Sequence, residues 1–401
     1  MNIINNINQI YTLNSKDLKL VFKLNNDNFN NFLTALNNNN SINSIIVDQL
    51  ILNNEKFINL IDILKNKHNL HKITIELNRK TDLKYINEIY KLNNVKINLI
   101  INIKGIINIK NLTEFILNTN IHKYELNASN KKDIQFLTSK SNINVFNITY
   151  HGYMIDDFFK FLIENNNIKE LKYKEYANRS NRGHDTYIMT NYINNTSINK
   201  LKLSQSDFYR YYYNHKAFIN SLKNNTSIKH LTLKNCEYIK DLEDALKNNK
   251  GIKTLEIYND NSSNNDWYYL NVAYKYSLTM NKVLEALQDN DTLENLYIDY
   301  DIIKSIRRGD HYVDDNTTFN SFFLKNKTLK RIVILDCFIT NIDGLIEGIK
   351  NNDNLEYLHL LFNNKLDKLN ILNEVLKSKK NIKFYKIDID TRNEGREFVW
   401  A

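Results

Sequence analysis

The chain has 401 residues, of which 25% are charged and 42% hydrophobic, and its formal net charge is +9. This composition is typical of a globular protein and excludes a disordered chain. A single compact core stops growing near about 250–300 residues, so the length indicates either two domains or an elongated repeat architecture.

The residue usage excludes several further classes of protein. Pro is absent and Gly occurs 8 times, whereas Asn occurs 72 times. The absence of Pro excludes PxxP ligands and Pro-rich hinges. The two cysteines, Cys236 and Cys337, are too few for a disulfide scaffold and favour a reducing compartment. The bias toward Asn, Ile and Lys is typical of AT-rich genomes, such as those of amoebal protists or their large DNA viruses.

The first residues and the most apolar segment predict neither secretion nor a membrane anchor. Residues 1–13 lack a basic stretch followed by an unbroken apolar one, so we expect no signal peptide. The most apolar window, residues 95–109, is interrupted by polar residues, and about 20 mostly apolar residues are needed to span a bilayer. The expected location is therefore intracellular, either cytoplasmic or nuclear, without contact with a membrane.

One unit recurs from residue 31 to residue 390, between an N-terminal cap predicted at 1–30 and a C-terminal tail at 391–401. An amphipathic stretch is followed by Asn-rich residues, an apolar anchor, two variable residues and an apolar-x-apolar triplet, as in residues 218–233 (FINSLKNNTSIKHLTL). The anchors are Ile42, Leu70, Ile121, Ile143, Ile168, Ile198, Ile228, Ile252, Leu293, Leu329, Leu355 and Ile382. The long interval between Leu70 and Ile121 predicts one more, degenerate copy near residues 95–99.

Each unit combines two periodicities. The triplet alternates apolar and polar residues, which predicts a short strand, and the preceding stretch has helical spacing. Asn-Asn pairs lie between the two, at 165–166, 194–195, 224–225, 248–249 and 351–352. We expect these asparagines to take the left-handed conformation that often ends a helix, in place of Gly. Neither half buries its apolar face alone, so the copies are predicted to stack as an α/β solenoid with parallel strands.

This pattern resembles the leucine-rich repeat family, in particular its long strand–helix class similar to ribonuclease inhibitor, whose motif is L-x-x-L-x-L-x-x-N/C-x-L. The resemblance implies a right-handed, horseshoe-shaped solenoid of about 12–13 repeats with a parallel concave sheet. It also implies that a buried polar residue at the N/C position hydrogen-bonds the loop backbone of neighbouring coils. The residues expected in this structural ladder are Asn78, Cys236, Cys337 and Asn363.

Catalytic constellations are not found in the sequence. It contains no Walker-type loop, no G-x-G-x-x-G, no H-E-x-x-H, no G-x-S-x-G and no C-x-x-C. His68 and His71 flank Leu70, but a metal site there needs two further ligands. We therefore expect a protein that is not an enzyme and holds neither a metal nor a cofactor.

The strand residues that flank the apolar positions are predicted to face the concave side, because side chains alternate along a strand. They predict a basic patch beside an aromatic strip. The members expected to bind a partner are Lys172, Lys174, Lys200, Lys202, His230, Lys234, Tyr258, Tyr297 and Tyr357. Residues 160–240 contain 14 Lys+Arg and 6 Asp+Glu, so nearly all the net positive charge is local. The alternative is that these lysines only solvate a surface that must be polar.

Four insertions follow their strands and are predicted to emerge along the same rim, at residues 174–192, 204–216, 259–279 and 301–318. They are rich in Tyr, Trp and Arg, the residues enriched at interface hot spots. The rim residues expected to bind are Arg210, Tyr211, Tyr212 and Trp267. Packing of these rings on one another is the alternative interpretation.

These observations predict a monomeric, non-enzymatic scaffold that binds an acidic protein through the concave patch and the rim. Nucleic-acid binding is the alternative, since basic residues interleaved with aromatic ones contact phosphates and stack on bases. A third hypothesis is a GTPase-activating role, as in some leucine-rich repeat proteins. The candidate fingers are then Arg179, Arg182, Arg307 and Arg308.

Overall fold

The computed structural model divides the chain into two compact units, residues 1–179 and 180–401, which are taken separately below. The boundary between them falls inside the first predicted insertion, residues 174–192. The residues that the structure describes are 2–4, 17–20, 26–47, 54–77, 92, 95–102, 121–128, 145–150, 167–175, 197–205, 215–234, 242–258, 280–299, 316–337, 342–362 and 367–389.

The described part of the first unit consists of parallel strands with two helices. Its helices are α2 (Asn26–Asn38) and α3 (Asn54–Leu64). Its strands are β1 (Asn2–Ile4), β2 (Asp17–Leu20), β3 (Ser44–Val47), β4 (Lys72–Leu77), β5 (Lys96–Asn102), β6 (Ile121–Ala128), β7 (Val145–Tyr150) and β8 (Glu170–Glu175). Each strand pairs in parallel with the next one in the sequence. Strand β5 confirms the degenerate copy predicted near residues 95–99.

The parallel strands begin earlier in the chain than the first predicted repeat. Strands β1 and β2 lie within residues 1–30, where the sequence predicts a cap. Leu18 of β2 aligns with Ile45 of β3, and Ile45 aligns with Ile73 of β4. The apolar register of the repeats therefore extends back to β2, although no full anchor-and-triplet pattern precedes Ile42.

The second unit repeats a strand, a turn and a helix. Its strands are β9 (Lys200–Gln205), β10 (His230–Lys234), β11 (Thr254–Tyr258), β12 (Asn295–Asp299), β13 (Arg331–Cys337), β14 (Tyr357–Phe362) and β15 (Phe384–Ile389). Its described helices are α7 (His215–Asn224), α8 (Leu242–Asn248), α10 (Met280–Leu287), α12 (Asn316–Lys325), α13 (Asp343–Lys350) and α14 (Leu369–Ser378). Because each helix returns the chain to the same end of the sheet, successive strands are parallel.

The register of the second unit is the one that the triplets predict. Leu231 of β10 aligns with Leu255 of β11, which aligns with Leu296 of β12. The same row continues through Ile332 of β13 and Leu358 of β14. All five side chains are at most 1% exposed, whereas the strand residues between the apolar ones are mostly half-buried. Strand alternation thus directs one row into the core and the other onto the opposite face of the strands.

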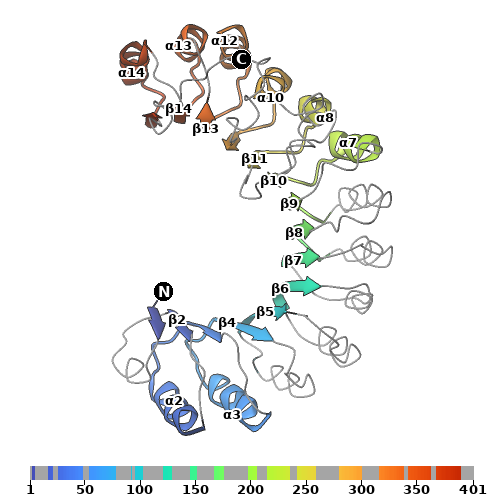
Figure 1. Cartoon of the computed structure of the whole chain (residues 1–401), viewed down its shortest axis with the longest axis vertical. Helices are drawn as coiled ribbons and strands as arrows, with labels where there is room; N and C mark the ends of the chain where they lie inside the picture. The colour runs from blue at the N-terminus through green and yellow to red at the C-terminus, as the bar shows by residue number, and fades with distance from the viewer. Residues whose placement is uncertain are drawn as a thin grey trace, which may run out of the picture. The chain divides into compact units, whose positions relative to one another are not determined.

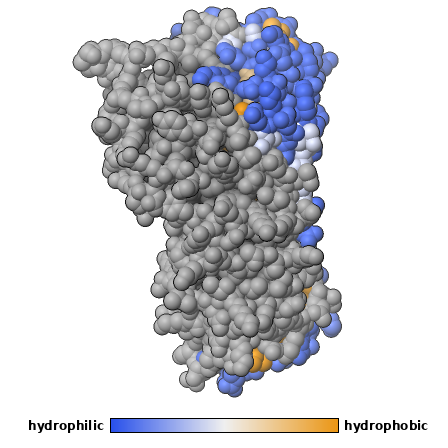
Figure 2. All heavy atoms as spheres, turned by 90° about the vertical axis from the view of Figure 1, so that its right-hand side faces the viewer, coloured by the Kyte–Doolittle hydropathy of each residue, from blue (hydrophilic) through white to orange (hydrophobic). Residues whose placement is uncertain are grey.

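The helices close the core on one side of the strands (Figure 1). In α8, Leu242, Ala245 and Leu246 are buried at helical spacing, and Glu243 and Asp244 occupy the first turn, where the helix dipole favours negative charge. In α12, Phe322 and Phe323 are buried with their rings edge to face, 5.1 Å apart at the centroids. The outward side of this helical layer is mostly hydrophilic among the described residues at the top of Figure 2.

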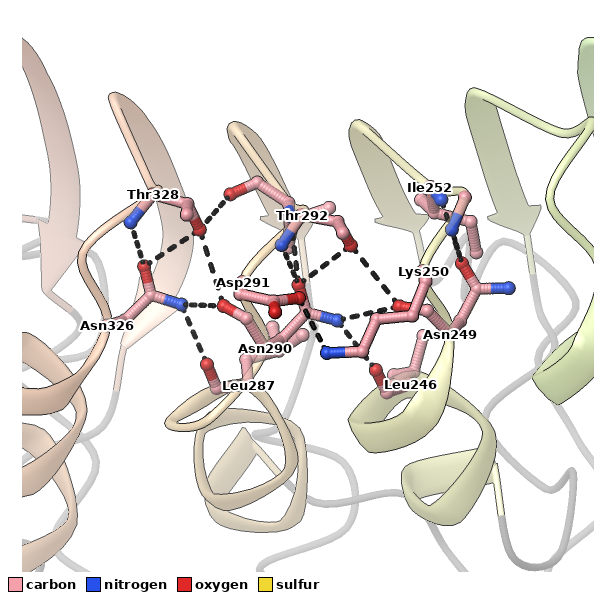
Figure 3. Close-up of polar contacts among 12 residues, drawn as sticks. Leu246, Asn249, Lys250, Ile252, Leu287, Asn290, Asp291, Thr292, Asn326 and Thr328 are labelled. Carbon is pink, nitrogen blue, oxygen red and sulfur yellow. Dashed lines mark hydrogen bonds and ion pairs between the residues drawn. The ribbon is translucent and has the colours of Figure 1, made fainter.

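Buried asparagines connect successive coils of the second unit, from the turn before β10 to the turn before β14. The members of this asparagine ladder are Asn225, Asn249, Asn290, Asn326 and Asn352, and all are at most 9% exposed. Asn290 is representative (Figure 3). Its Nδ2 donates to the carbonyl oxygens of Leu246 and Asn249, at 2.9 and 3.2 Å. Its Oδ1 accepts from the backbone N–H groups of Thr292 and Leu293, at 3.0 and 2.8 Å. One side chain thus satisfies backbone groups on two coils.

At the end of α13 the asparagine does not act as the left-handed cap that the sequence predicts. Asn351 caps α13 with φ −98° and ψ 5°, so the prediction of a left-handed cap is wrong at this position. Its backbone N–H is shared between the carbonyls of Glu347 and Ile349, which tightens the last turn without a positive φ. The second member of the pair, Asn352, is the one with the structural role, because it belongs to the ladder.

Lysine takes the ladder position in two other coils. Lys67, three residues before the anchor Leu70, is 8% exposed and donates through Nζ to Asn37 O, Asn39 O and Asn40 Oδ1. Burial lowers the pKa of this amine. Lys379, three residues before Ile382, donates to Lys350 O at 3.0 Å and to Asp353 Oδ1 at 2.7 Å. The shared requirement is a donor aimed at the carbonyls of the preceding coil.

Gly251 shows how closely adjacent coils approach at this turn. A Cβ atom at this position would lie 2.7 Å from Asn225 O and 2.8 Å from Thr226 Cα. Both atoms belong to the backbone of the preceding coil and cannot rotate away. Glycine is therefore required here by the close packing of the two turns.

Candidate interaction surface

The strand face opposite the helices, called the open face here, carries the candidate site. It is formed in the second unit by the strand residues that alternate with the core row. The register sets its side chains in three rows across the strands. The first row begins at Lys200 and the second at Lys202, and both continue through the aligned residues of β10 to β15. The third begins at Ser204 and continues to Leu335 of β13, where the register with β14 shifts.

The lysines of the predicted basic patch are divided between the two units. Lys172 is exposed on β8 of the first unit, and Lys174 lies on the same strand. Lys200 and Lys202 are half-buried on β9 of the second unit, aligned with His230 and Thr232 of β10. Lys234 aligns with Ser204. Within the second unit, Lys200, Lys202, His230 and Lys234 are thus on two paired strands, as predicted; the continuous patch across both units stays a prediction.

A carboxylate borders the basic residues at β11. Glu256 Oε2 accepts a 2.9 Å hydrogen bond from Thr232 Oγ1. Its Oε1 lies 3.2 Å from His230 Nε2, a buried atom that makes no hydrogen bond within the described residues. The contact is therefore electrostatic only when the imidazole is protonated. The Glu256 carboxylate therefore offsets part of the positive charge that the sequence predicts for this face.

Two tyrosines of the predicted aromatic strip are half-buried on the open face. Tyr297 lies in the second row, where burial raises the pKa of its phenol and the carboxylates of Asp299 and Glu256 raise it further. Tyr357 lies in the first row, two strands further on. The third predicted tyrosine, Tyr258, aligns with Lys234 at the end of β11.

Sequence reasoning missed Arg331 and Phe384, which flank Tyr357 in the first row. The Arg331 guanidinium carbon lies 4.1 Å from the centroid of the Tyr357 ring. The Phe384 ring stacks on Tyr357, with centroids 4.7 Å apart and planes 13° apart. The same register that selects Tyr357 also selects Arg331 and Phe384, two residues after the anchors Leu329 and Ile382. We call these three residues the cation–aromatic stack.

A small ion-pair cluster lies beside the stack, on β14 and β15. Asp388 Oδ2 lies 3.0 Å from His359 Nε2 and 2.6 Å from Lys386 Nζ. The hydrogen bond from Lys386, followed by that from His359, holds the pKa of the Asp388 carboxyl below its usual value. Lys386 and Asp388 are therefore paired with each other.

An open groove runs along the turns that precede the strands of the second unit, and its charges cancel. Its charged lining residues are Lys253, Asp291, Glu294, Lys327, Lys330, Asp353, Glu356 and Lys383, four of each sign. In the position after each anchor the sign alternates from coil to coil, from Lys253 through Glu294, Lys330 and Glu356 to Lys383. Glu294 lies 3.0 Å from Lys253 and 3.6 Å from Lys330. This groove is therefore a poor site for a highly charged ligand.

The alternating charges predict a loss of stability in acid. Hydrogen bonds from lysine, Lys253 for Glu294 and Lys383 for Glu356, hold the pKa of both carboxyls below the reference value of 4.5. A carboxyl with a lower pKa in the folded state stabilises the fold at neutral pH, and this contribution is lost as the pH falls from the unfolded value through the folded one. We expect the melting temperature to fall between about pH 5 and about pH 3.

The measurement is differential scanning calorimetry across this range on the wild type and the Glu294→Gln/Glu356→Gln double variant. The variant should show a shallower dependence on pH, because glutamine does not titrate. Identical slopes would mean that the two carboxyls do not stabilise the fold. The effect is small in magnitude, because solvent screens ion pairs at exposed positions.

The remaining predicted residues fall outside the part of the chain that the structure describes. These are Arg210, Tyr211, Tyr212 and Trp267 of the rim, the proposed fingers Arg179, Arg182, Arg307 and Arg308, and Asn78, Cys236 and Asn363 of the family-type ladder. Cys337 is the last residue of β13, and its backbone aligns with Phe362. Their expected roles stay predictions.

The described residues contain neither a ligand cluster for a metal ion nor a membrane-spanning helix. Within those ranges, no three His, Cys, Asp or Glu side chains gather as ligands for a metal ion. No helix in the same ranges is both long enough and apolar enough to cross a bilayer.

Comparison with known proteins gives likeness only at the level of structure. No protein-family model matches the sequence, and neither does any curated protein. The chain is similar to the crystal structure of a TLR13–ssRNA13 complex, with a TM-score of 0.44 and 12% identity over 87% of this chain and 41% of that one. It is also similar to the Rad7–Elc1 complex of yeast, with a TM-score of 0.44 and 13% identity over 90% of this chain and 80% of that one. Neither likeness bears on what this chain binds.

The class of protein is defined by the repeat itself. In the second unit, parallel strands in one apolar register alternate with helices, and the copies from β9 to β15 carry the apolar anchor and triplet. The fold is an α/β solenoid of the leucine-rich repeat type, as the sequence predicts.

Proposed function

We propose that this protein is a non-enzymatic scaffold that binds another protein through the open face of its second unit. The observation that carries the proposal is the difference between the two faces. The open face keeps Tyr297, Tyr357 and Phe384 partly exposed, whereas the helical layer is mostly hydrophilic (Figure 2). Exposed aromatic side chains on a rigid element are characteristic of protein-binding surfaces.

The geometry of the face supports a protein as partner more than a nucleic acid. Nucleic-acid binding requires several cations free to contact phosphates. In the second unit, Lys253, Lys330 and Lys383 are paired with carboxylates along the groove, and Lys386 is paired with Asp388 on the open face. Lys200, Lys202 and Lys234 stay candidates for an acidic partner, which is the finer part of the proposal.

The test is an affinity capture from lysate of the source cells, with three versions of the chain and with or without nuclease. The open-face variant is Tyr297→Ser/Tyr357→Ser, and the control is Lys247→Gln/Lys377→Gln on the helical layer. We expect a protein that the wild type and the control retain equally, nuclease or not. The open-face variant should retain about tenfold less of it.

Two outcomes would contradict the proposal. Equal retention by the open-face variant would mean that the partner binds elsewhere, and retention that disappears with nuclease would assign the chain to nucleic acid. A further variant, in which Lys172, Lys200, Lys202 and Lys234 are all replaced by Glu, tests the acidity of the partner. Unchanged retention by this variant would contradict binding through the basic patch but would not contradict the proposed scaffold function.

A further inference from the structure

We propose that the cation–aromatic stack is the anchor for one carboxylate of a partner protein, carried on a segment that also presents an apolar side chain. This inference rests on the proposed function, and it names the contact that gives the open face its specificity. The stack is Arg331, Tyr357 and Phe384, aligned in the first row of β13, β14 and β15.

The guanidinium of Arg331 is held in place, and no carboxylate among the described residues pairs with it. It lies over the Tyr357 ring, which in turn stacks on Phe384, so the guanidinium is positioned before any partner arrives. Among the described residues Arg331 makes no ion pair. A planar, five-donor guanidinium that is already oriented loses little freedom when it binds a carboxylate through two parallel hydrogen bonds.

The presence of arginine at position 331 is informative, because arginine is rare in this chain. Lysine and arginine total 54, of which 9 are arginine, and Arg331 is the single arginine within the described ranges. Lysine would provide the same charge at this exposed position. It would not provide the flat surface that stacks on Tyr357 or the fork that matches a carboxylate.

The charges around the stack favour one carboxylate over a polyanion. Lys330 and Lys383, adjacent in sequence to Arg331 and Phe384, are paired with Glu294 and Glu356. Lys386 of β15 is paired with Asp388. A nucleic acid would need several of these cations for consecutive phosphates. A single carboxylate needs only Arg331.

The apolar residues of the open face indicate what should accompany the carboxylate on the partner segment. Phe384 is 46% exposed at one end of the stack. Leu335, four residues after Arg331 on β13, and Leu361 on β14 are half-buried on the open face. Four residues of strand span about 13 Å, so an extended partner segment should place an apolar side chain four residues from its acidic one.

The probe is a phage-displayed library of random dodecapeptides, selected on the purified full-length wild-type chain. The strongest peptide is synthesised with a fluorescent label, and its dissociation constant is measured by fluorescence anisotropy. We expect it to carry an Asp or Glu and an aromatic or aliphatic residue four positions away. Circular dichroism of every variant checks the fold, which exposed substitutions should leave unchanged.

The expected losses of affinity are specific to the stack. Arg331→Gln should weaken binding about tenfold or more, and Arg331→Lys should also weaken it, because the ammonium keeps the charge but not the fork. Replacing the acidic residue of the peptide by its amide should cost as much, and should cost nothing further on the Arg331→Gln background. Lys377→Gln, which removes one charge from α14 on the opposite layer, should have no effect.

Each other outcome overturns the inference in a recognisable way. If peptide binding is insensitive to Arg331→Gln but lost in Tyr297→Ser/Tyr357→Ser, the anchor is elsewhere on the open face and the proposed function stands. A selection that yields no peptide, or peptides without a carboxylate, also rejects the anchor. Tight binding of a labelled single-stranded oligonucleotide that Arg331→Gln abolishes would replace the peptide by a nucleic acid, and would contradict the proposed function as well.

Discussion

Replacing Asn352 by Ala should lower the free energy of unfolding of the second unit by about 3–5 kcal/mol. Asn352 is 3% exposed, and its Nδ2 donates to Phe323 O at 2.7 Å and to Asn326 O at 3.4 Å. Its Oδ1 accepts from the N–H groups of Asn354 and Leu355. Alanine removes these four hydrogen bonds, and each buried group that is left unsatisfied costs about 1–3 kcal/mol. Urea unfolding followed by circular dichroism measures the change.

The neighbouring residue provides a matched control. Asn351 is exposed, and its side chain hydrogen-bonds within its own helix, to Glu347. Asn351→Ala removes the same amide from the same turn and should change stability by less than about 1 kcal/mol. Equal effects of the two substitutions would show that the ladder does not hold the coils together. Asn352→Asp should also destabilise, because a carboxylate cannot donate to the two carbonyls.

Replacing Leu231 by Asp should abolish cooperative folding of several coils of the second unit. Leu231 is fully buried on β10, between Leu201 and Leu255 of the two adjacent strands. Removing a buried leucine side chain costs about 2–5 kcal/mol, and burying an unpaired carboxylate adds to this cost. The sum exceeds about 5 kcal/mol, and a coil that fails to form removes the packing surface of its neighbours. Thermal melting followed by circular dichroism should show a smaller, broader transition.

Lys229→Asp is the control for this substitution. Lys229 is two residues away and exposed, and its Nζ contacts only the Thr226 carbonyl among the described residues. The same carboxylate placed there remains in water and should change stability by about 1 kcal/mol at most. A Leu231→Asp chain that melts as sharply as the Lys229→Asp chain would contradict the register.

The strand register was predictable because it depends on a local signal. Alternation within each triplet determines which side chains enter the core, and Leu231, Leu255 and Leu296 are aligned as that signal predicts. Strands β1 and β2 were not predicted, because their short apolar segments lack the anchor that marks the later copies.

The asparagine ladder was missed although the sequence contains its signal. Its members lie three residues before their anchors, as Asn290 lies before Leu293 and Asn326 before Leu329. The family motif specifies a buried polar residue after the strand and none before the anchor. Assigning the Asn-Asn pairs to helix capping accounted for one backbone conformation, but not for the carbonyls of the preceding coil, which require a donor.

The candidate site was predictable in part. Alternation places Tyr297 and Tyr357 on the open face, and the same rule applied to β13 and β15 selects Arg331 and Phe384. Their stacking could not be predicted, because it depends on side-chain rotation and on the separation of adjacent strands. Nor could the ion pairs be predicted from the sequence. Lys330 is a poor contact for an anionic ligand because Glu294 lies beside it, and this depends on the packing of adjacent coils.

The alternating charges of the groove constrain how such a protein grows by duplication. The asparagine ladder recognises backbone carbonyls, so it accepts any coil as a neighbour. The row of charged residues from Lys253 to Lys383 does not accept any coil as a neighbour, because the sign of the charge changes from each coil to the next. A single coil inserted between Glu294 and Lys330 would set two like charges side by side, whereas two coils of opposite sign would restore the order. Tandem copies of this array are therefore expected to be gained and lost in pairs.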